Sequence, residues 1–310
     1  MSTSSPADTV KPAATLPGTE AVDPRYESLD RWAPGIRVEA MWEAQLAAVA
    51  AVRPALPAIS AAAAAAAIRL GRHGRLVYAG AGTSGRIGVQ DGAELPPTFD
   101  WPVERTIMLM AGGDGAFIRS IENAEDDREA AEAAVAAHGI GRADVMIGVA
   151  ASGSTPFTVA AIQAARERGA LTIGVSNSAG GTLLKAAEHA ILAETGAEVL
   201  AGSTRMKAGT AQKIVLNLLS TEVMIALGRV HRGLMVDMQA RNAKLRLRAV
   251  RMLRTLTGRE DAALEAALAE AGGRVKTAVL VLEGLDRAHA EALLAEHGGK
   301  LRAALASLGA

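Results

Sequence analysis

The sequence predicts an α/β protein: a doubly wound, mostly parallel sheet followed by a small all-helical C-terminal domain. Between residues 73 and 236, short apolar runs alternate with helical stretches, which is the pattern of βαβ units. Most of these runs are followed by a turn rich in Gly, Ser or Thr. Beyond residue 237 no such pattern returns, and glycines divide the chain into short helical lengths.

The chain before this region is expected to be a tail followed by helices. Residues 1–23 are rich in Ser, Thr, Pro and Ala but lack the basic start and apolar core of a signal peptide, so we expect a disordered tail. Apolar residues recur at helical spacing over residues 37–52, and an alanine run fills most of residues 60–69. Residues 24–72 are therefore expected to form an N-terminal helical segment.

Five short strands are expected to make the sheet of the α/β domain. They cover residues 76–79, 106–110, 145–150, 171–175 and about 190–192. Because the carboxyl ends of parallel strands meet at one edge of a sheet, ligands bind there. A long amphipathic helix that opens near Ser203 ends the domain.

Residues 237–310 are expected to form a separate domain of short helices. The expected breaks between these helices fall at Gly258, Gly272, Gly273, Gly284, Gly298 and Gly299. No internal repeat is apparent along the chain.

Composition excludes several classes of protein. Lys and Arg together number 33, as do Asp and Glu, so no basic excess attracts nucleic acid or an anionic membrane. With no cysteine, and six histidines without metal-ligand spacing, we expect no disulfide, no metal and no cofactor. No apolar run approaches the roughly eighteen residues that span a bilayer, so a cytoplasmic location is expected.

Two hydroxyl-rich turns each follow a predicted strand and precede a predicted helix. Residues 80–86 read GAGTSGR and residues 151–156 read ASGSTP. Small residues let the backbone approach an anion, and a helix N-terminus adds free N–H groups. The first turn also fits a dinucleotide fingerprint, but no acidic residue ends a second strand about 20 residues on. A tight turn or a helix cap explains either turn alone, whereas the pair favours a phosphate monoester site. The predicted ligands are Gly82, Thr83, Ser84, Ser152, Ser154 and Thr155.

Two acidic segments are candidates for acid–base chemistry. Pro96 and Pro97 are expected to end the preceding helix near Glu94. The negative end of the helix dipole there would help a carboxyl group hold its proton, as a general acid requires, and a solvated helix end is the alternative. The acidic run over residues 122–129 suits the start of a helix, so that capping explains most of its members.

A basic segment precedes the long helix. Residues 202–210 read GSTRMKAGT, and Arg205 and Lys207 are placed to neutralise an anion at the start of that helix. The alternative is that both are surface cations.

Taken together, these motifs resemble the N-acetylmuramic acid 6-phosphate etherase family. The resemblance rests on residues 80–86, on the segment around Glu94 with its two prolines, on residues 122–126 and on residues 202–211, and it runs from about residue 19 to the C-terminus. It implies a sugar isomerase-type phosphosugar domain, a homodimer and a ubiquitin-associated-like C-terminal domain. The chain departs from the family pattern at Ser154, where Arg is common, and at Gly233, where Asn is common.

The resemblance also implies a reaction and its residues. N-acetylmuramic acid 6-phosphate and water give N-acetylglucosamine 6-phosphate and D-lactate, in cell-wall amino sugar recycling. Ring opening acidifies the C2 proton, a carboxylate removes it, lactate leaves from C3 and water adds. The two catalytic carboxylates fall on Glu94, as proton donor to lactate, and on Glu125, as base. The phosphate-binding hydroxyls fall on Ser84, Ser152 and Thr155.

Two other functions use the same kind of fold. A non-catalytic sugar-phosphate regulator, such as a glucokinase regulatory protein, resembles two phosphosugar domains in tandem, and this chain has room for one. An aldose–ketose isomerase keeps the phosphate turns but lacks the segment 205–211. Retention of Glu94 and Glu125 favours the etherase.

Overall fold

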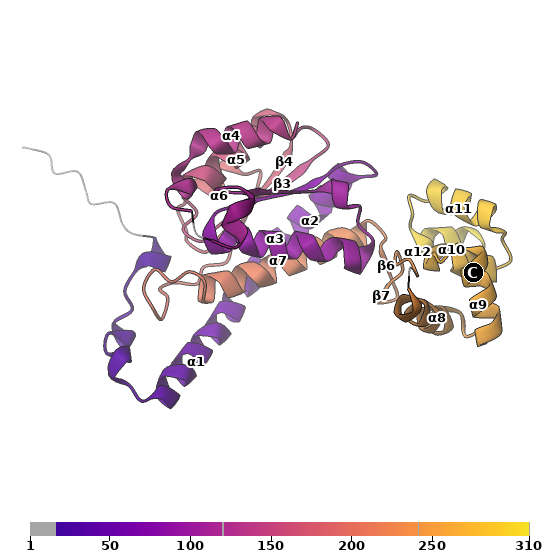
Figure 1. The fold of residues 1–310 in the computed structure, drawn as a ribbon, viewed down its shortest axis with the longest axis horizontal. Helices are drawn as coiled ribbons and strands as arrows, with labels where there is room; N and C mark the ends of the chain where they lie inside the picture. Colours follow the sequence, from indigo (N-terminus) through magenta and orange to yellow (C-terminus); the bar gives the residue numbers. More distant parts are fainter. Residues whose placement is uncertain (1–16, 120, 241, 310) are drawn as a thin grey trace, which may run out of the picture.

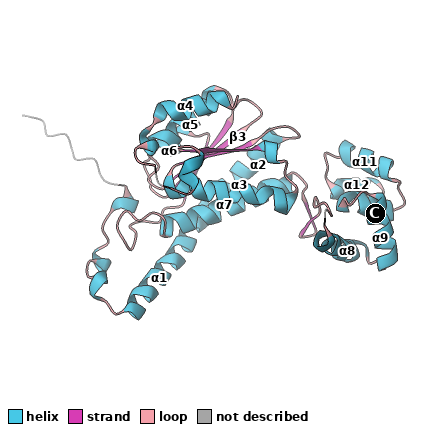
Figure 2. Ribbon diagram, viewed as in Figure 1, coloured by secondary structure: helices cyan, strands magenta, loops and turns pink. Residues whose placement is uncertain are grey.

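The computed structural model describes residues 17–119, 121–240 and 242–309 of the chain. Its centre is a five-stranded parallel sheet with the strand order β2-β1-β3-β4-β5. The strands are β1 (Leu76–Gly80), β2 (Thr106–Met110), β3 (Val145–Ala150), β4 (Leu171–Ser176) and β5 (His189–Leu192). Figure 2 shows the sheet between two layers of helices, which confirms the predicted doubly wound α/β fold.

Alternate residues of each strand pack against helices on opposite faces of the sheet. Tyr78 belongs to the core beneath one face, and its neighbour Val77 belongs to the core on the other face. The first core includes residues of α2 (Leu56–Leu70), α3 (Gly82–Phe99) and α7 (Lys207–Ala226). The second is covered by α4 (Arg128–Ala137), α5 (Pro156–Glu167) and α6 (Thr182–Ala186). Burial on both faces explains why the strands read as unbroken apolar runs (Figure 1).

The N-terminal helices differ in how far they are buried. Helix α1 (Pro34–Val52) projects from the α/β domain (Figure 1), whereas α2 packs into the core beneath the sheet. The stretch Pro34–Leu70 is long and apolar enough to span a membrane by length and composition alone, with a mean hydropathy of 1.6 in its most apolar window. The sequence analysis did not expect a stretch of this kind. In the structure, 33% of that window is buried, and α2 within this stretch is a core helix of the globular domain.

Helix α3 does not end near Glu94, so that prediction is wrong. It continues through Pro96 and Pro97 to Phe99, with an Asp100 N–H that donates to the Pro96 carbonyl. The two prolines remove two helical N–H donors, but the buried side chains of Leu95 and Phe99 hold the last turn in the core. Glu94 therefore lies inside the helix rather than in its last turn, and the dipole argument does not apply to it.

Helix α7 begins at Lys207, four residues after Ser203, the predicted start. The carboxylate of Glu198 accepts hydrogen bonds from the N–H groups of Lys207 and Ala208, both at 2.9 Å. These are two of the donors that a helix leaves unpaired at its N-terminus. The cap comes from the β5–α7 connection itself, nine residues before the helix starts, which lies outside the short window of the usual capping patterns.

A short hairpin that the sequence analysis did not predict follows α7. Its strands, β6 (Val230–His231) and β7 (Leu234–Met235), are too short to give a periodic signal. Arg232 and Gly233 between them have φ values of 50° and 76°. Gly and Asn are the residues that adopt this left-handed conformation most readily, so the exchange of Asn for Gly at position 233 preserves the turn.

Residues beyond the hairpin form five helices around their own core. They are α8 (Ala243–Thr257), α9 (Asp261–Glu270), α10 (Val275–Leu282), α11 (Arg287–Glu296) and α12 (Leu301–Ser307). The core contains Leu253, Leu264, Leu268 and Leu280. The gaps between the helices coincide with the predicted glycine breaks, whereas the exact domain boundaries stay predictions.

The tail expected over residues 1–23 lies mostly outside the described residues. The described residues begin at Pro17, and Gly18–Glu20 form a short 3₁₀ turn. Thr19 in this turn is fully buried, and its hydroxyl is hydrogen-bonded to that of Ser178 at 3.3 Å. This contact fixes the N-terminal segment beside the carboxyl ends of the strands.

Candidate active site

A cavity of about 360 Å³ lies at the carboxyl ends of β1 and β3. Because these strands are neighbours in the sheet, the two hydroxyl-rich turns that follow them meet here. Its lining includes Gly82, Thr83, Ser84, Ser152, Ser154 and Thr155, together with Glu125. The structure thus brings together all six predicted phosphate ligands and one of the two predicted carboxylates.

The backbone of the first turn requires glycine. A Cβ atom on Gly80 would lie 2.8 Å from Gly85, and one on Gly85 would lie 2.3 Å from the sulfur of Met110. The strand and the first turn of α3 can therefore approach each other only without side chains. The N-termini of α3 and α5 consequently open toward the same cavity, which is a favourable arrangement for an anion.

Glu125 enters the cavity from the 3₁₀ turn Ala124–Asp126. Asn123 before it takes up the left-handed conformation, with a φ of 59°, and so redirects the chain into this turn. Asp127 after it accepts a 2.8 Å hydrogen bond from the N–H of Ala130 and caps α4, as expected for most of the acidic run. Glu125 has no hydrogen-bond or ion-pair partner among the described residues, so its carboxylate is available to a ligand.

A second cavity of about 390 Å³ adjoins the first and shares Ala81, Gly82 and Glu125 with it. Arg86 is the one basic residue among the described residues that line either cavity. Its Nε donates to the carbonyls of Ala116 and Phe117 at 3.1 and 3.2 Å, which orients the guanidinium. The first cavity thus offers hydroxyl and helix N–H donors beside three carboxylates, and the second offers an oriented cation.

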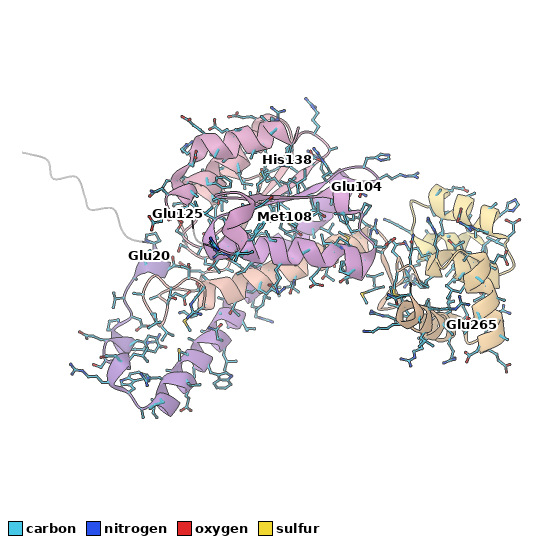
Figure 3. The ribbon with its side chains drawn as sticks, in the orientation of Figure 1. Glu20, Glu104, Met108, Glu125, His138 and Glu265 are labelled. Carbon is cyan, nitrogen blue, oxygen red and sulfur yellow. The ribbon has the colours of Figure 1, made fainter. Side chains whose placement is uncertain are left out.

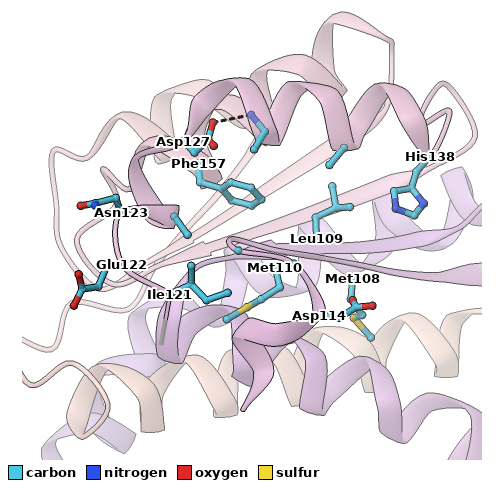
Figure 4. Close-up of a pocket in the computed structure, with 15 residues that line it drawn as sticks. Met108, Leu109, Met110, Asp114, Ile121, Glu122, Asn123, Asp127, His138 and Phe157 are labelled. Carbon is cyan, nitrogen blue, oxygen red and sulfur yellow. Dashed lines mark hydrogen bonds between the residues drawn. The ribbon is translucent and has the colours of Figure 1, made fainter. Parts of the chain in front are cut away.

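A third cavity, of about 630 Å³, extends along the edge strand β2 (Figure 4). Ile121 and Asn123 belong to both its wall and that of the second cavity. Its far end is lined by Met108 and His138. The cavity beside Glu125 therefore adjoins a larger one along β2, with Ile121 and Asn123 between them.

Glu94 does not line any of these three cavities. It lies ten residues beyond Ser84, about 15 Å along α3, and its side chain is exposed. Its neighbour Asp91 is buried instead, and accepts hydrogen bonds from Tyr78 at 2.9 Å and Asn217 at 2.6 Å. Burial, followed by the charge of Asp91, raises the pKa of Tyr78 well above its usual value, so this group stays a neutral donor. Asp91 therefore has a structural role.

Arg205 and Lys207 also lie outside these cavities. Lys207 is buried, and its amine donates to the Thr195 carbonyl at 2.9 Å. Burial lowers its pKa, although the nearby carboxylates of Glu198 and Asp23 oppose that effect. Arg205 is exposed. Their proposed contacts with substrate stay predictions.

Sequence reasoning missed Glu20, which lines the first cavity beside Glu125. Figure 3 shows both carboxylates at the same end of the α/β domain. Buried Thr19 holds the preceding backbone and so positions Glu20. The Glu20 carboxylate also lies close to Gly202, where an added Cβ atom would be only 3.0 Å from it. The resemblance described above begins at about residue 19, and that start was the available signal, although local patterns alone give Glu20 no role.

Known proteins resemble the chain in two ways. Residues 59–166 match the glucokinase regulatory protein N-terminal SIS domain, and residues 126–222 match the SIS domain. The N-acetylmuramic acid 6-phosphate etherase of Deinococcus radiodurans is 50% identical over 86% of this chain and 87% of its own length. The etherase of Rubrobacter xylanophilus is 43% identical over 85% and 88%, and that of Symbiobacterium thermophilum is 53% identical over 69% and 71%.

Proposed function

The chain belongs to the N-acetylmuramic acid 6-phosphate etherase family, and on that premise we propose that it is a carbon–oxygen lyase. It converts N-acetylmuramic acid 6-phosphate and water to N-acetylglucosamine 6-phosphate and D-lactate, in the cytoplasm and in the recycling of cell-wall amino sugars. The observation that carries the proposal is the cavity that combines two helix N-termini with Glu125. Incubation with the substrate should release D-lactate, and absence of D-lactate would leave only sugar-phosphate binding.

The phosphate is bound by neutral groups. Ser84, Ser152 and Thr155 supply hydroxyls, and the starts of α3 and α5 supply N–H groups, around one cavity. The described residues that line this cavity include no Lys or Arg, and the carboxylates of Glu20, Glu125 and Asp126 complete its lining. Such a site recognises and releases a phosphate without transferring it, as the reaction requires.

Glu125 acts as the base that removes the C2 proton of the ring-opened sugar. Once the aldehyde at C1 has acidified this proton, a carboxylate suffices to take it, and such transfer contributes roughly 10²–10⁴-fold. Lactate then leaves C3 with the ether oxygen and accepts a proton from Glu94. Water adds to C3 of the unsaturated aldehyde, and the C2 proton is restored. The position of Glu125 at the junction of two cavities supports this role.

Arg86 binds the carboxylate of the lactyl group. The substrate carries two anionic groups, and the phosphate cradle accounts for one of them. Arg86 lines the second cavity, which shares Glu125 with the cradle, and this supports the assignment. A guanidinium fork matches a carboxylate geometrically. Sugar phosphates that lack the lactyl group would not use this cation.

The protein acts as a homodimer through α1. Its outer face carries Val38, Trp42, Leu46 and Val49, each at least half exposed, at helical spacing. The opposite face, with Ala44 and Ala48, is buried on the protein. An apolar stripe on a projecting helix is stabilised by a second copy of the same helix. Light scattering should therefore give twice the 31.8 kDa chain mass.

The dimer explains why Glu94 and Glu125 do not share a cavity in one chain: the partner supplies Glu94. Co-expression of Glu94→Gln and Glu125→Gln chains tests this directly. Each variant alone should be inactive. Random pairing makes half of the dimers mixed, with one of their two sites intact, so about a quarter of native activity should return. No recovery in verified mixed dimers would place both carboxylates in one subunit.

A further inference from the structure

A cavity of about 690 Å³ lies between the α/β domain and the C-terminal helical domain, away from the catalytic cavities. Its walls come from the ends of α2 and α7 on one side, and from α10 and the loop between α11 and α12 on the other. Its charged lining residues are Arg72, Arg105, Arg229, Lys276, Lys300 and Asp237. Five cations thus face one carboxylate, in a chain whose total charge is zero.

Two of the cations are held on one aromatic ring. The guanidinium carbons of Arg105 and Arg229 lie 4.0 and 5.0 Å from the ring centroid of Trp101. Arg105 donates to the carbonyls of Leu70 and Gly74 at the end of α2, and Arg229 donates to the carbonyl of Phe99 at the end of α3. These bonds fix both guanidiniums close together.

Their mutual repulsion is only partly offset. Burial, and then the positive charge of Arg229, lowers the pKa of Arg105 to about 10, while Glu104 outside the cavity acts in the opposite direction. Asp237 is already shared, at 3.4 Å from Arg229 and 2.7 Å from Lys276. A partly buried pair of like charges of this kind is stabilised by a bound anion.

The outer cations have no such partners. Arg72 and Lys300 are exposed at the rim, and the structure gives their charged groups no hydrogen bond or ion pair within its described residues. Ile68, Leu227 and Leu294 line the rest of the cavity. The cavity therefore combines a cationic floor and rim with an apolar wall.

We propose that this junction is a second ligand site, which binds a small phosphorylated metabolite independently of catalysis. Its phosphate lies between the Arg105–Arg229 pair and the rim cations, and its carbon skeleton lies against the apolar wall. The site has both domains as walls, so a bound ligand links them. It does not depend on which reaction the catalytic cavity performs.

The test uses inorganic pyrophosphate as the probe and Trp101 as the reporter. A Trp32→Phe, Trp42→Phe background leaves Trp101 as the single tryptophan of the chain. Pyrophosphate should change the emission of Trp101 saturably. Removal of both rim cations, Arg72→Gln with Lys300→Gln, should weaken binding about tenfold, which corresponds to two partly exposed ion pairs, without loss of the fold.

A matched double variant controls for net charge. Lys244→Gln with Arg248→Gln removes two exposed cations of α8 that do not line the cavity, and its affinity should stay within twofold of the parent. Equal affinity in the rim and control variants, or no saturable signal, would overturn the proposal. A signal abolished by Ser152→Ala but kept by the rim variant would place the anion in the catalytic cavity and also overturn it.

Discussion

Replacement of Arg86 by Met should impair recognition of the lactyl group selectively. Met keeps most of the volume of the stem but removes the charge. A hydrogen bond to a charged group contributes about 1.5–3 kcal/mol, and the partial exposure of Arg86 favours the lower end, so kcat/KM should fall about 10- to 30-fold. Because the carboxylate is bound in both the ground state and the transition state, most of the loss should appear in KM.

The assay compares two ligands of the same protein. KM for N-acetylmuramic acid 6-phosphate is measured from D-lactate release, and the inhibition constant of N-acetylglucosamine 6-phosphate is measured alongside it. The product lacks the lactyl group, so its inhibition constant should stay within about twofold, as expected for uniform phosphate binding. Arg119→Met, on an exposed residue outside the cavities, is the control. Equal weakening of both ligands would refute the assignment and indicate a structural role through the Ala116 and Phe117 carbonyls.

Three further outcomes follow from the same structure. Ser152→Ala should weaken the binding of inorganic phosphate at least about tenfold, measured by isothermal titration, and should leave the melting temperature unchanged. If the native protein bound phosphorylated and unphosphorylated sugars equally, the assignment of the phosphate site would be wrong. Glu125→Gln should abolish C2–H exchange in deuterated water as well as lactate release, and retained exchange would reverse the roles of the two glutamates. Asp144→Asn should lower the free energy of unfolding at pH 7 by about 1–3 kcal/mol. Burial would raise the pKa of Asp144, but hydrogen bonds from Arg75 and Gly141 lower it overall, so the stability difference between native protein and variant should shrink below about pH 4. A stability difference that stays constant with pH would contradict this.

Local patterns in the sequence were sufficient for the five strands of the sheet and for the two hydroxyl-rich turns that line the first cavity. Buried parallel strands read as apolar runs, and a hydroxyl-rich turn between a strand and a helix lies at the ligand-binding edge of such a sheet. Neighbouring positions of β1 and β3 then place Ser84 and Ser152 together. The strand order that makes β1 and β3 neighbours comes from the structure, because the sequence analysis predicted the strands but not their order.

Features that depend on distant parts of the chain were not predictable in this way. The N-terminus of α7 is capped by Glu198 from nine residues upstream, because the β5–α7 loop folds back on the helix start. Glu20 lines the site next to Thr19, which is buried against Ser178 from the far side of the sequence. The two prolines of α3 are tolerated because Leu95 and Phe99 pack in the core. In each case tertiary packing outweighs the local preference, and single-sequence patterns do not contain it.

The measurement that tests the central claim most directly is a double isotope experiment on the native protein. Elimination followed by addition breaks the C3–O bond, so in ¹⁸O-labelled water the label should enter N-acetylglucosamine 6-phosphate and not D-lactate. In deuterated water, deuterium should appear at C2 of the product, because the proton taken by Glu125 exchanges with solvent. Label in D-lactate, or an unlabelled C2 in a product that carries ¹⁸O, would contradict the mechanism.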